Sequence, residues 1–403
     1  MNNKEAEFHP QTQAVIAGET DKQTARPVVP DLSLSTSYFT DDEVAFSIEG
    51  QGDQIPYLYT RWGNPTVRLL EQKMALLEHA EAGVATASGM AAATTLFLYC
   101  LKAGDHILIS DICYAAVSEM GNQMLPELGI EVTRVNTSHA EEIEQAIQPN
   151  TRLIYTESPC NPIIRLTDLN AVVEIAHRHG AIVATDNTFG SPMATNPIDF
   201  GVDYVIHSMS KYICGHGDAI GGIVLGKARD IESIRRRVLI RTGGILSPFN
   251  AFLINRGLVT LPLRMKTHEE NALQVARFLE NHPAIKQVTY PGLESHPQHE
   301  LAARQMKNYS GMLTFRVGKD ARKLAHRMNK HLKVIKYAVS LGHHHSLIYY
   351  LPTADMLSTT FRLSSTQEAD YRSYAHEGIF RMSAGLEDAS DICRDLDLIL
   401  NQG

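Results

Sequence analysis

The sequence predicts an α/β protein with a mainly parallel sheet flanked by helices, followed by a smaller α+β C-terminal domain. Between about residues 63 and 255, short apolar segments typical of strands alternate with stretches of helical periodicity. After about residue 256 helices and strands follow in a less regular order. We therefore divide the chain into an N-terminal arm (1–62), a central domain (63–255) and a C-terminal domain (256–403).

The predicted elements follow from local signals along the chain. The arm is rich in turn formers and aromatic residues without sustained periodicity, which suits a segment that reaches over another surface. Asn64 and Pro65 begin a helix, and Gly104 can end another. In the central domain we expect helices at 64–80, 88–104 and 169–180 and strands at 83–87, 106–110, 130–135, 152–157, 181–186, 203–208 and 219–225. In the C-terminal domain we expect helices near 268–281 and 320–331 and strands near 311–317 and 334–340.

The composition excludes several classes of protein. With 403 residues, 44% of them hydrophobic and 20% charged, the chain can form two globular cores. The net charge is −8 and basic residues are dispersed apart from Arg235–Arg237, which argues against nucleic-acid binding. Five cysteines without C-x-x-C spacing indicate neither a disulfide framework nor a thiolate zinc site. Without a leader or a long apolar segment, we expect a cytoplasmic protein and no metal or membrane partner.

Several polar residues stand where predicted strands end. Ser88, Glu157, Asp186, Ser208 and Ser210 each follow the carboxyl end of a strand. Open α/β sheets bind ligands along this edge, so the sequence predicts a site there.

Each candidate in this region has a structural alternative. Lys211, in SMSKYICGHGD, is either a solvated loop lysine or a covalent cofactor anchor. Ser88 is either a helix N-cap or, with Gly89, part of a phosphate site at a helix start. Asp186 either caps a turn or, partly desolvated, needs a cationic partner such as a protonated pyridine nitrogen. Tyr114 is either a core aromatic or a ring that lies over a flat cofactor. Taken together, the ligand-binding alternatives describe pyridoxal phosphate.

Six segments carry a resemblance to a known family. YLYTRWGNPT, SGMAA, ESPCNP, DNTFGSP, SMSKYICGHGD and RMSAGLED resemble, in the same order and across nearly the whole chain, the pyridoxal-phosphate enzymes of cysteine and methionine metabolism. Methionine γ-lyase, cystathionine γ-lyase, cystathionine β-lyase and cystathionine γ-synthase belong to that family. The resemblance implies an aspartate aminotransferase-like fold (fold type I), pyridoxal 5'-phosphate as cofactor, and a homotetramer built from dimers with shared active sites.

The resemblance also implies roles for individual residues. Lys211 would bind the cofactor covalently and later shuttle protons, Asp186 would keep the ring nitrogen protonated, and Tyr114 would stack on the ring and assist the leaving group. Within the chain, the residues that would hold the phosphate are Ser88, Gly89, Met90, Ser208 and Ser210. Tyr59 and Arg61 would reach the same phosphate from the arm of a neighbouring subunit.

On the substrate side, Arg381 would hold the α-carboxylate, helped by Ser340 and Asn161, because a guanidinium fits a carboxylate in a fork. Glu157 and His345 complete the predicted substrate-binding set. The alternative for Arg381 is a surface ion pair.

Departures from the family concern the substrate. Ala116 occupies the position where methionine γ-lyases usually have cysteine, and His343–His345 follow the SLG segment where an acidic residue is common. The histidines either form a surface loop or mark a changed specificity pocket. The stretch from about 353 to 380 also departs from the family and is expected to line an entrance for a polar γ-substituent.

We therefore expect γ-elimination or γ-replacement on an amino acid, with a preference for oxygen-linked substituents, as in canavanine or O-substituted homoserines, over sulfur-linked ones, as in methionine or cystathionine. The alternatives are a cystathionine β-lyase and a non-catalytic binding subunit.

Overall fold

The computed structural model describes residues 8–16, 28–40, 47–48, 56–318 and 320–401. In this part of the chain, seven strands form one sheet in the order β1-β7-β6-β5-β4-β2-β3. They are β1 Ala82–Thr86, β2 His106–Ser110, β3 Glu131–Val135, β4 Thr151–Glu157, β5 Ile182–Asp186, β6 Tyr204–Ser208 and β7 Gly222–Gly226. Strands β2 to β6 are parallel, whereas β7 pairs antiparallel with β1 and β6. The prediction of a mainly parallel sheet is therefore confirmed.

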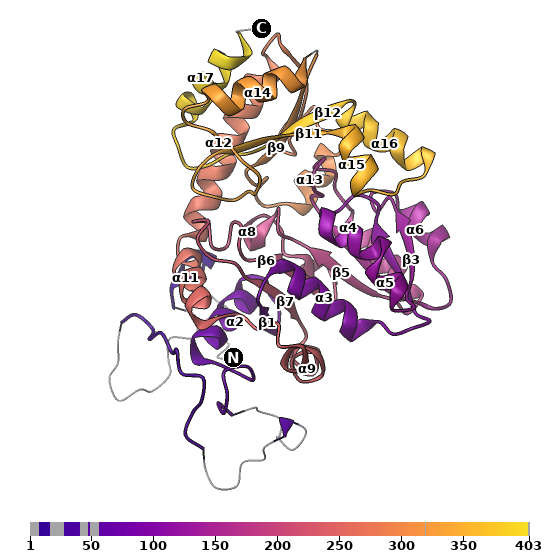
Figure 1. Ribbon diagram of the computed structural model, residues 1–403, viewed down its shortest axis with the longest axis vertical. Helices are drawn as coiled ribbons and strands as arrows, with labels where there is room; N and C mark the ends of the chain where they lie inside the picture. Colours follow the sequence, from indigo (N-terminus) through magenta and orange to yellow (C-terminus); the bar gives the residue numbers. More distant parts are fainter. Residues whose placement is uncertain (1–7, 17–27, 41–46, 49–55, 319, 402–403) are drawn as a thin grey trace.

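Helices cover both faces of this sheet (Figure 1). Side chains from α2, α7 and α11 pack on one face, and side chains from α3, α4 and α9 pack on the other. Successive residues of a strand contribute to opposite faces, as in β4, where Leu153 packs with the second group and Ile154 with the first. The helical segments up to residue 258 are α1 Pro10–Ile16, α2 Pro65–Leu77, α3 Gly89–Cys100, α4 Ala115–Asn122, α5 Met124–Glu127, α6 Ala140–Ala146, α7 Leu169–Arg178, α8 Ser191–Ala194, η2 Pro197–Phe200, α9 Ala228–Ile234, η3 Arg235–Leu239, α10 Ile240–Thr242 and α11 Pro248–Leu258.

A second sheet, in the order β10-β11-β12-β9-β8, forms the core of the smaller domain. Its strands are β8 Ile285–Thr289, β9 Met312–Val317, β10 Lys336–Tyr337, β11 Leu347–Pro352 and β12 Gly378–Ser383. The helices α12 Leu261–Glu280, α14 Ala321–His331 and α17 Ala389–Leu400 pack against it, and α13 His299–Gln305 lies between β8 and β9 in the chain. The predicted boundary at 255/256 falls within α11.

One strand of the smaller domain is shorter than predicted, and two helices lie where no element was predicted. The strand expected at 334–340 contains two residues, and the chain then turns at Ser340 (φ 90°) and Gly342 (φ 69°). The stretch after β11 forms two helices, α15 Thr353–Thr359 and α16 Ser365–Ala375. A capping box between Ser364 and Gln367 begins α16.

None of the helices in the described ranges is both long and apolar enough to cross a membrane.

Candidate active site

A cavity of about 400 Å³ opens at the carboxyl ends of β4, β5 and β6, with the smaller domain on its other side. Of the fifteen predicted site residues, twelve line it: Ser88, Gly89, Met90, Tyr114, Glu157, Asn161, Asp186, Ser208, Ser210, Lys211, Ser340 and Arg381. The structure therefore brings together residues that are almost 300 positions apart in the sequence.

Lys211 lies in the turn that follows β6. Its Nζ atom donates a hydrogen bond to Oγ of Ser340, at 2.9 Å, across the boundary between the two domains. Burial lowers the pKa of Lys211, and the nearby positive charge of Arg381 lowers it further. A lysine whose neutral form is favoured is suited to react with an aldehyde and to accept a proton.

The first turn of α3 forms an anion site. Ser88 is the N-cap, since its Oγ accepts the N–H of Ala91 at 3.1 Å and its carbonyl accepts that of Ala92 at 3.0 Å. The N–H groups of Gly89 and Met90, which precede them, have no partner within the described residues and lie at the positive end of the helix. The two alternatives considered for Ser88 are thus compatible: its side chain is a cap, and the turn that it caps presents free donors.

Gly89 permits a close approach of α3 to the sheet. A Cβ atom at this position would lie 2.8 Å from Cβ of Ser208, which is closer than packed carbon atoms come. Ser208 is held in turn by its N–H, which donates to Oγ1 of Thr188 at 2.8 Å. Ser210, on the same turn, accepts the N–H of Gly221 at 3.1 Å. The two serine hydroxyls and the start of α3 therefore lie on one wall of the cavity.

Asp186 ends β5 and lines the cavity. One carboxylate oxygen accepts the N–H of Thr188 at 2.9 Å, and the other accepts the hydroxyl of Tyr155 at 3.3 Å. Burial nevertheless raises the pKa of Asp186. A buried carboxylate with only neutral donors gains from a cationic partner, and a protonated pyridine nitrogen supplies one.

Glu157, which ends the neighbouring strand β4, is engaged by the backbone. One of its oxygens accepts the N–H of Tyr114 and the other that of Asn161, both at 2.7 Å. Burial raises the pKa of Glu157 well above its usual value, and the negative charge of Asp186 adds to this effect. The carboxylate therefore fixes two loops, a role that its place at a strand end did not indicate.

Arg381 enters the cavity from β12. Its Nη1 donates to Oδ1 of Asn161 at 2.6 Å and its Nη2 to the carbonyl of Ser340 at 3.3 Å. Burial lowers the pKa of Arg381 to about 10, against the effect of the Glu157 carboxylate. These two acceptors are neutral amide oxygens, so the guanidinium can receive a carboxylate.

Tyr114 is the N-cap residue of α4, and its side chain is exposed where it lines the cavity. A ring with an open face at the mouth of a cavity can stack on a planar ligand. The alternative of a core aromatic does not apply in the described chain, because 46% of its surface is accessible.

Three predicted residues do not line the cavity. Arg61 donates to the carbonyl of Ile240 at 2.6 Å, and its guanidinium lies 5.6 Å from the ring centre of Tyr59, which is 45% exposed. The imidazole of His345 lies beside the carboxylate of Glu387, with Nδ1 at 3.5 Å from Oε1. The stretch from 353 to 380, expected at an entrance, also contributes no residue to the lining, because its helices pack elsewhere.

Sequence reasoning missed some residues of the site. Tyr155 and Thr188 bond to Asp186, and Ile220 and Val339 add an apolar part to the cavity wall. The position of Thr188 two residues after Asp186 was a usable signal, because an aspartate side chain commonly accepts the backbone N–H two residues further along the chain. Within the described residues, no group of three or more histidine, cysteine or acidic side chains could hold a metal ion.

Comparisons with known proteins identify the family of this chain. Residues 11–401 match the family described as Cys/Met metabolism PLP-dependent enzyme. The canavanine γ-lyase of Pseudomonas canavaninivorans is 40% identical over 97% of this chain and 96% of its own. The L-methionine γ-lyase of Porphyromonas gingivalis is 40% identical over 96% of this chain and 95% of its own.

A solved structure, cystathionine γ-lyase from Lactobacillus plantarum complexed with L-serine, has 32% identity to this chain. It superimposes with a TM-score of 0.86 and covers 98% of this chain and 99% of its own. This match and the two-sheet architecture confirm the predicted fold type I, and the residues along the cavity fit the cofactor that the family requires. The chain belongs to the family of pyridoxal-phosphate-dependent enzymes of cysteine and methionine metabolism, and pyridoxal phosphate is its cofactor.

Proposed function

We propose that this protein is a γ-lyase, an enzyme that eliminates the substituent at Cγ of an α-amino acid. One observation carries the proposal: Ser340 contacts both an aldehyde-reactive lysine and an arginine that can receive a carboxylate. Its Oγ accepts from Lys211 and its carbonyl accepts from Arg381. An α-amino acid carries an amino group and a carboxylate on one carbon atom. The canavanine γ-lyase and the L-methionine γ-lyase among its relatives support the γ-lyase class.

The residues of the cavity divide the work of such a reaction. Bound pyridoxal phosphate supplies an electron sink for the charge left when Cα loses its proton. Arg381, oriented by Asn161, would hold the substrate carboxylate and so fix which bond at Cα breaks. Because its pKa is lowered, Lys211 would accept the proton from Cα.

A second proton must leave Cβ before the γ-substituent can depart. Lys211 lines the cavity, and we assign this second proton transfer to it as well. Tyr114, whose ring lies at the mouth, would stack on the cofactor and place its hydroxyl toward the leaving group. The γ-substituent leaves with a proton, and hydrolysis gives a 2-oxo acid and ammonia; if water is captured at Cγ, the second product is homoserine.

For the substrate, we propose an amino acid whose γ-substituent is uncharged. The charged residues of the cavity wall, Glu157, Asp186, Lys211 and Arg381, all have contacts or roles described above, and the apolar wall includes Ile220 and Val339. A distal ammonium or guanidinium would therefore be desolvated without a partner from this chain.

The preference for oxygen-linked substituents remains a proposal that rests on Ala116 and on the canavanine γ-lyase among the relatives. The position of His345 beside Glu387 gives it no support. Uncharged oxygen-linked compounds, such as O-acetylhomoserine, satisfy both arguments.

A substrate panel tests the proposal. Methionine, O-acetylhomoserine, canavanine and cystathionine are compared by kcat/KM, with ammonia, 2-oxo acids and homoserine all quantified. We expect O-acetylhomoserine to rank above methionine and cystathionine, and Lys211→Ala to abolish product. Pyruvate from cystathionine as the main product would replace this proposal with β-elimination, and a chain that retains the cofactor but turns over none of the four would contradict a lyase.

For assembly, we propose a homotetramer of dimers in which the arm enters the neighbouring site. Support comes from Tyr59 and Arg61, which match the family's phosphate-binding motif and yet lie away from the cavity of their own chain. We also propose a cytoplasmic location, supported by five cysteines that are all free thiols.

A further inference from the structure

The segment between β11 and β12 belongs to the smaller domain in sequence but contacts the central domain in space. Figure 1 shows α15 and α16 beside α4, and the carbonyl of Thr360, between the two helices, accepts the side chains of Ser118 and Asn122 of α4, both at 3.1 Å. Beneath this segment Phe361 and Tyr371 are buried. They pack with Ile112, Cys160 and Ile163 of the central domain, which flank Tyr114 and Asn161 of the active site in the sequence.

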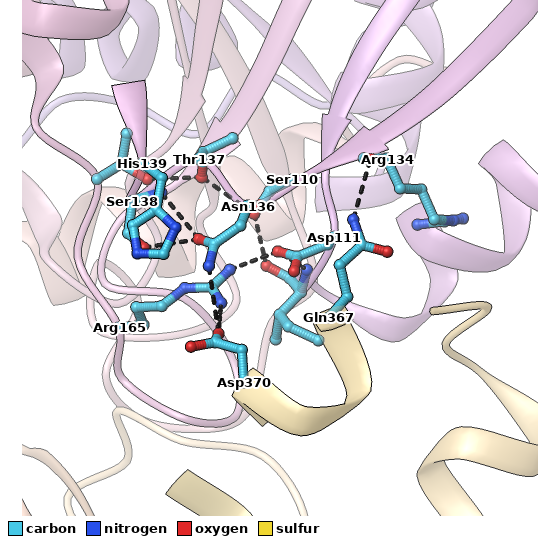
Figure 2. Close-up of polar contacts among 12 residues, drawn as sticks. Ser110, Asp111, Arg134, Asn136, Thr137, Ser138, His139, Arg165, Gln367 and Asp370 are labelled. Carbon is cyan, nitrogen blue, oxygen red and sulfur yellow. Dashed lines mark hydrogen bonds and ion pairs between the residues drawn. The ribbon is translucent and has the colours of Figure 1, made fainter. Parts of the chain in front are cut away.

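A polar group at the first turns of α16 completes this docking (Figure 2). Gln367 donates from Nε2 to the carbonyl of Arg134 at 3.1 Å while its Oε1 accepts the N–H that begins the helix. One oxygen of Asp370 accepts from Nη1 of Arg165 at 2.5 Å and from the side chain of Asn136 at 3.2 Å. We call Arg134, Asn136, Arg165, Gln367 and Asp370 the α16 contact.

Arg165 connects the α16 contact to the loop that carries Tyr114. Its other nitrogen, Nη2, forms a short bond to Oδ1 of Asp111. The same oxygen accepts the N–H of Ile112 at 2.8 Å, two residues before Tyr114. The guanidinium of Arg165 is 3% exposed and thus holds two carboxylates from a buried position.

Arg165 also connects the α16 contact to the loop that carries Asn161. The carbonyl of Arg165 accepts the N–H of Cys160 at 2.9 Å, which closes the loop around Asn161. Asn161 in turn accepts from Arg381. A continuous series of contacts therefore runs from Asp370 through Arg165 to the residue that orients the arginine of the active site.

We propose that Asp370 is a positioning residue: through Arg165 it sets the loops of Tyr114 and Asn161 and so prepares Arg381 for the substrate carboxylate. The inference rests on the proposed role of Arg381. It assigns α16 a function in substrate affinity, although no residue of α16 lines the cavity.

Kinetics of Asp370→Ala in the cofactor-loaded enzyme test the proposal. Without Asp370, Arg165 loses one of its two carboxylates and the loop of Asn161 is less restrained. We expect KM to rise five- to twentyfold while kcat stays within twofold and the cofactor content is unchanged. Asp370→Asn, which keeps an acceptor but not the charge, should give a smaller rise.

Glu368→Ala is the matched control, since Glu368 lies on the same helix and pairs with Arg372 at the surface. It should leave both constants unchanged. A second readout is the binding of L-norvaline, followed by the absorption of the bound cofactor. Because norvaline has no leaving group, its Kd tests the proposal even if γ-elimination is wrong, and it should rise in parallel with KM.

The proposal is overturned if both KM and the norvaline Kd of Asp370→Ala stay within twofold of wild type. It is also overturned if kcat falls in proportion to lost cofactor, because that result indicates general damage to the structure. If Asp370→Ala does not fold, Asp370→Asn decides: an unchanged Kd refutes the role, and a raised Kd with full cofactor content supports it.

Discussion

Replacing Gly89 with alanine tests whether the first turn of α3 holds the cofactor phosphate. The new Cβ would lie 2.8 Å from Cβ and 3.1 Å from Cα of Ser208. Ser208 ends β6, which pairs with β5 on one side and β7 on the other, so α3 must move instead. Overpacking of this kind costs about 1–3 kcal/mol. If that cost falls on cofactor binding, the Kd for pyridoxal phosphate rises roughly 5- to 150-fold.

The assay is titration of the cofactor-free protein with pyridoxal phosphate, followed by absorption. Gly244→Ala is the control, because the nearest atoms lie 3.9 Å from a Cβ at that position. Both variants lose the same backbone freedom in the unfolded chain. Equal Kd values for Gly89→Ala, Gly244→Ala and wild type would refute the assignment of the phosphate to this turn.

Three further predictions concern the substrate arginine, pH and assembly. Arg381→Lys should lower kcat/KM by roughly 10- to 100-fold at unchanged cofactor content, because a charged hydrogen bond in a fork is worth about 1.5–3 kcal/mol; unchanged steady-state kinetics would contradict this. Burial lowers the pKa of His268 and His296 to about 4, below the value of about 6.5 in the unfolded chain, so the stability they confer is complete above pH 6.5 and is lost as pH falls toward 4. In urea unfolding, the free energy of unfolding should fall by about 2 kcal/mol per histidine from pH 7 to pH 5, and His268→Gln should halve the total fall. A free energy of unfolding that does not change between these pH values would contradict this prediction. Co-assembled Arg61→Ala and Lys211→Ala chains should regain activity that neither has alone, because one site in a mixed dimer carries neither lesion; confirmed hybrids without any gain would exclude a shared site.

The edge of the central sheet could be predicted from the sequence because strand patterns and polar residues coincide there. Apolar runs such as HILIS and YVIHS mark buried strands, and the residue after such a run must lie at the carboxyl end of the sheet. From these patterns we predicted that Asp186 and Lys211 lie at the same edge of the sheet, and both line the same cavity. The prediction failed for Glu157 in one respect: the position was predicted, but its bonds to two backbone N–H groups depend on loops that carry no periodic signal.

The substrate side was harder to predict for physical reasons. Turns at Ser340 and Gly342 set the direction of the histidine run, and a sequence of three histidines does not reveal which way each ring points. His345 therefore lies beside Glu387 instead of in the cavity. Polar groups of Gln367 and Asp370, as well as apolar contacts, hold helix α16 in place. The helix therefore has low amphipathicity, and its hydrophobic periodicity did not predict it.

The bonds of Glu157 have a consequence for how specificity can evolve in this protein. Its two oxygens tie the aromatic and the carboxylate-binding parts of the site to one side chain, so a mutation there alters both at once. Ile220 and Val339, by contrast, are 60% and 62% exposed at the cavity and offer only apolar side-chain surface. Substitutions at these two positions can reshape the room for a leaving group while the shared machinery is preserved. Specificity for a new substrate is therefore most easily acquired at Ile220 and Val339, and homologues that differ in substrate should vary first at these positions.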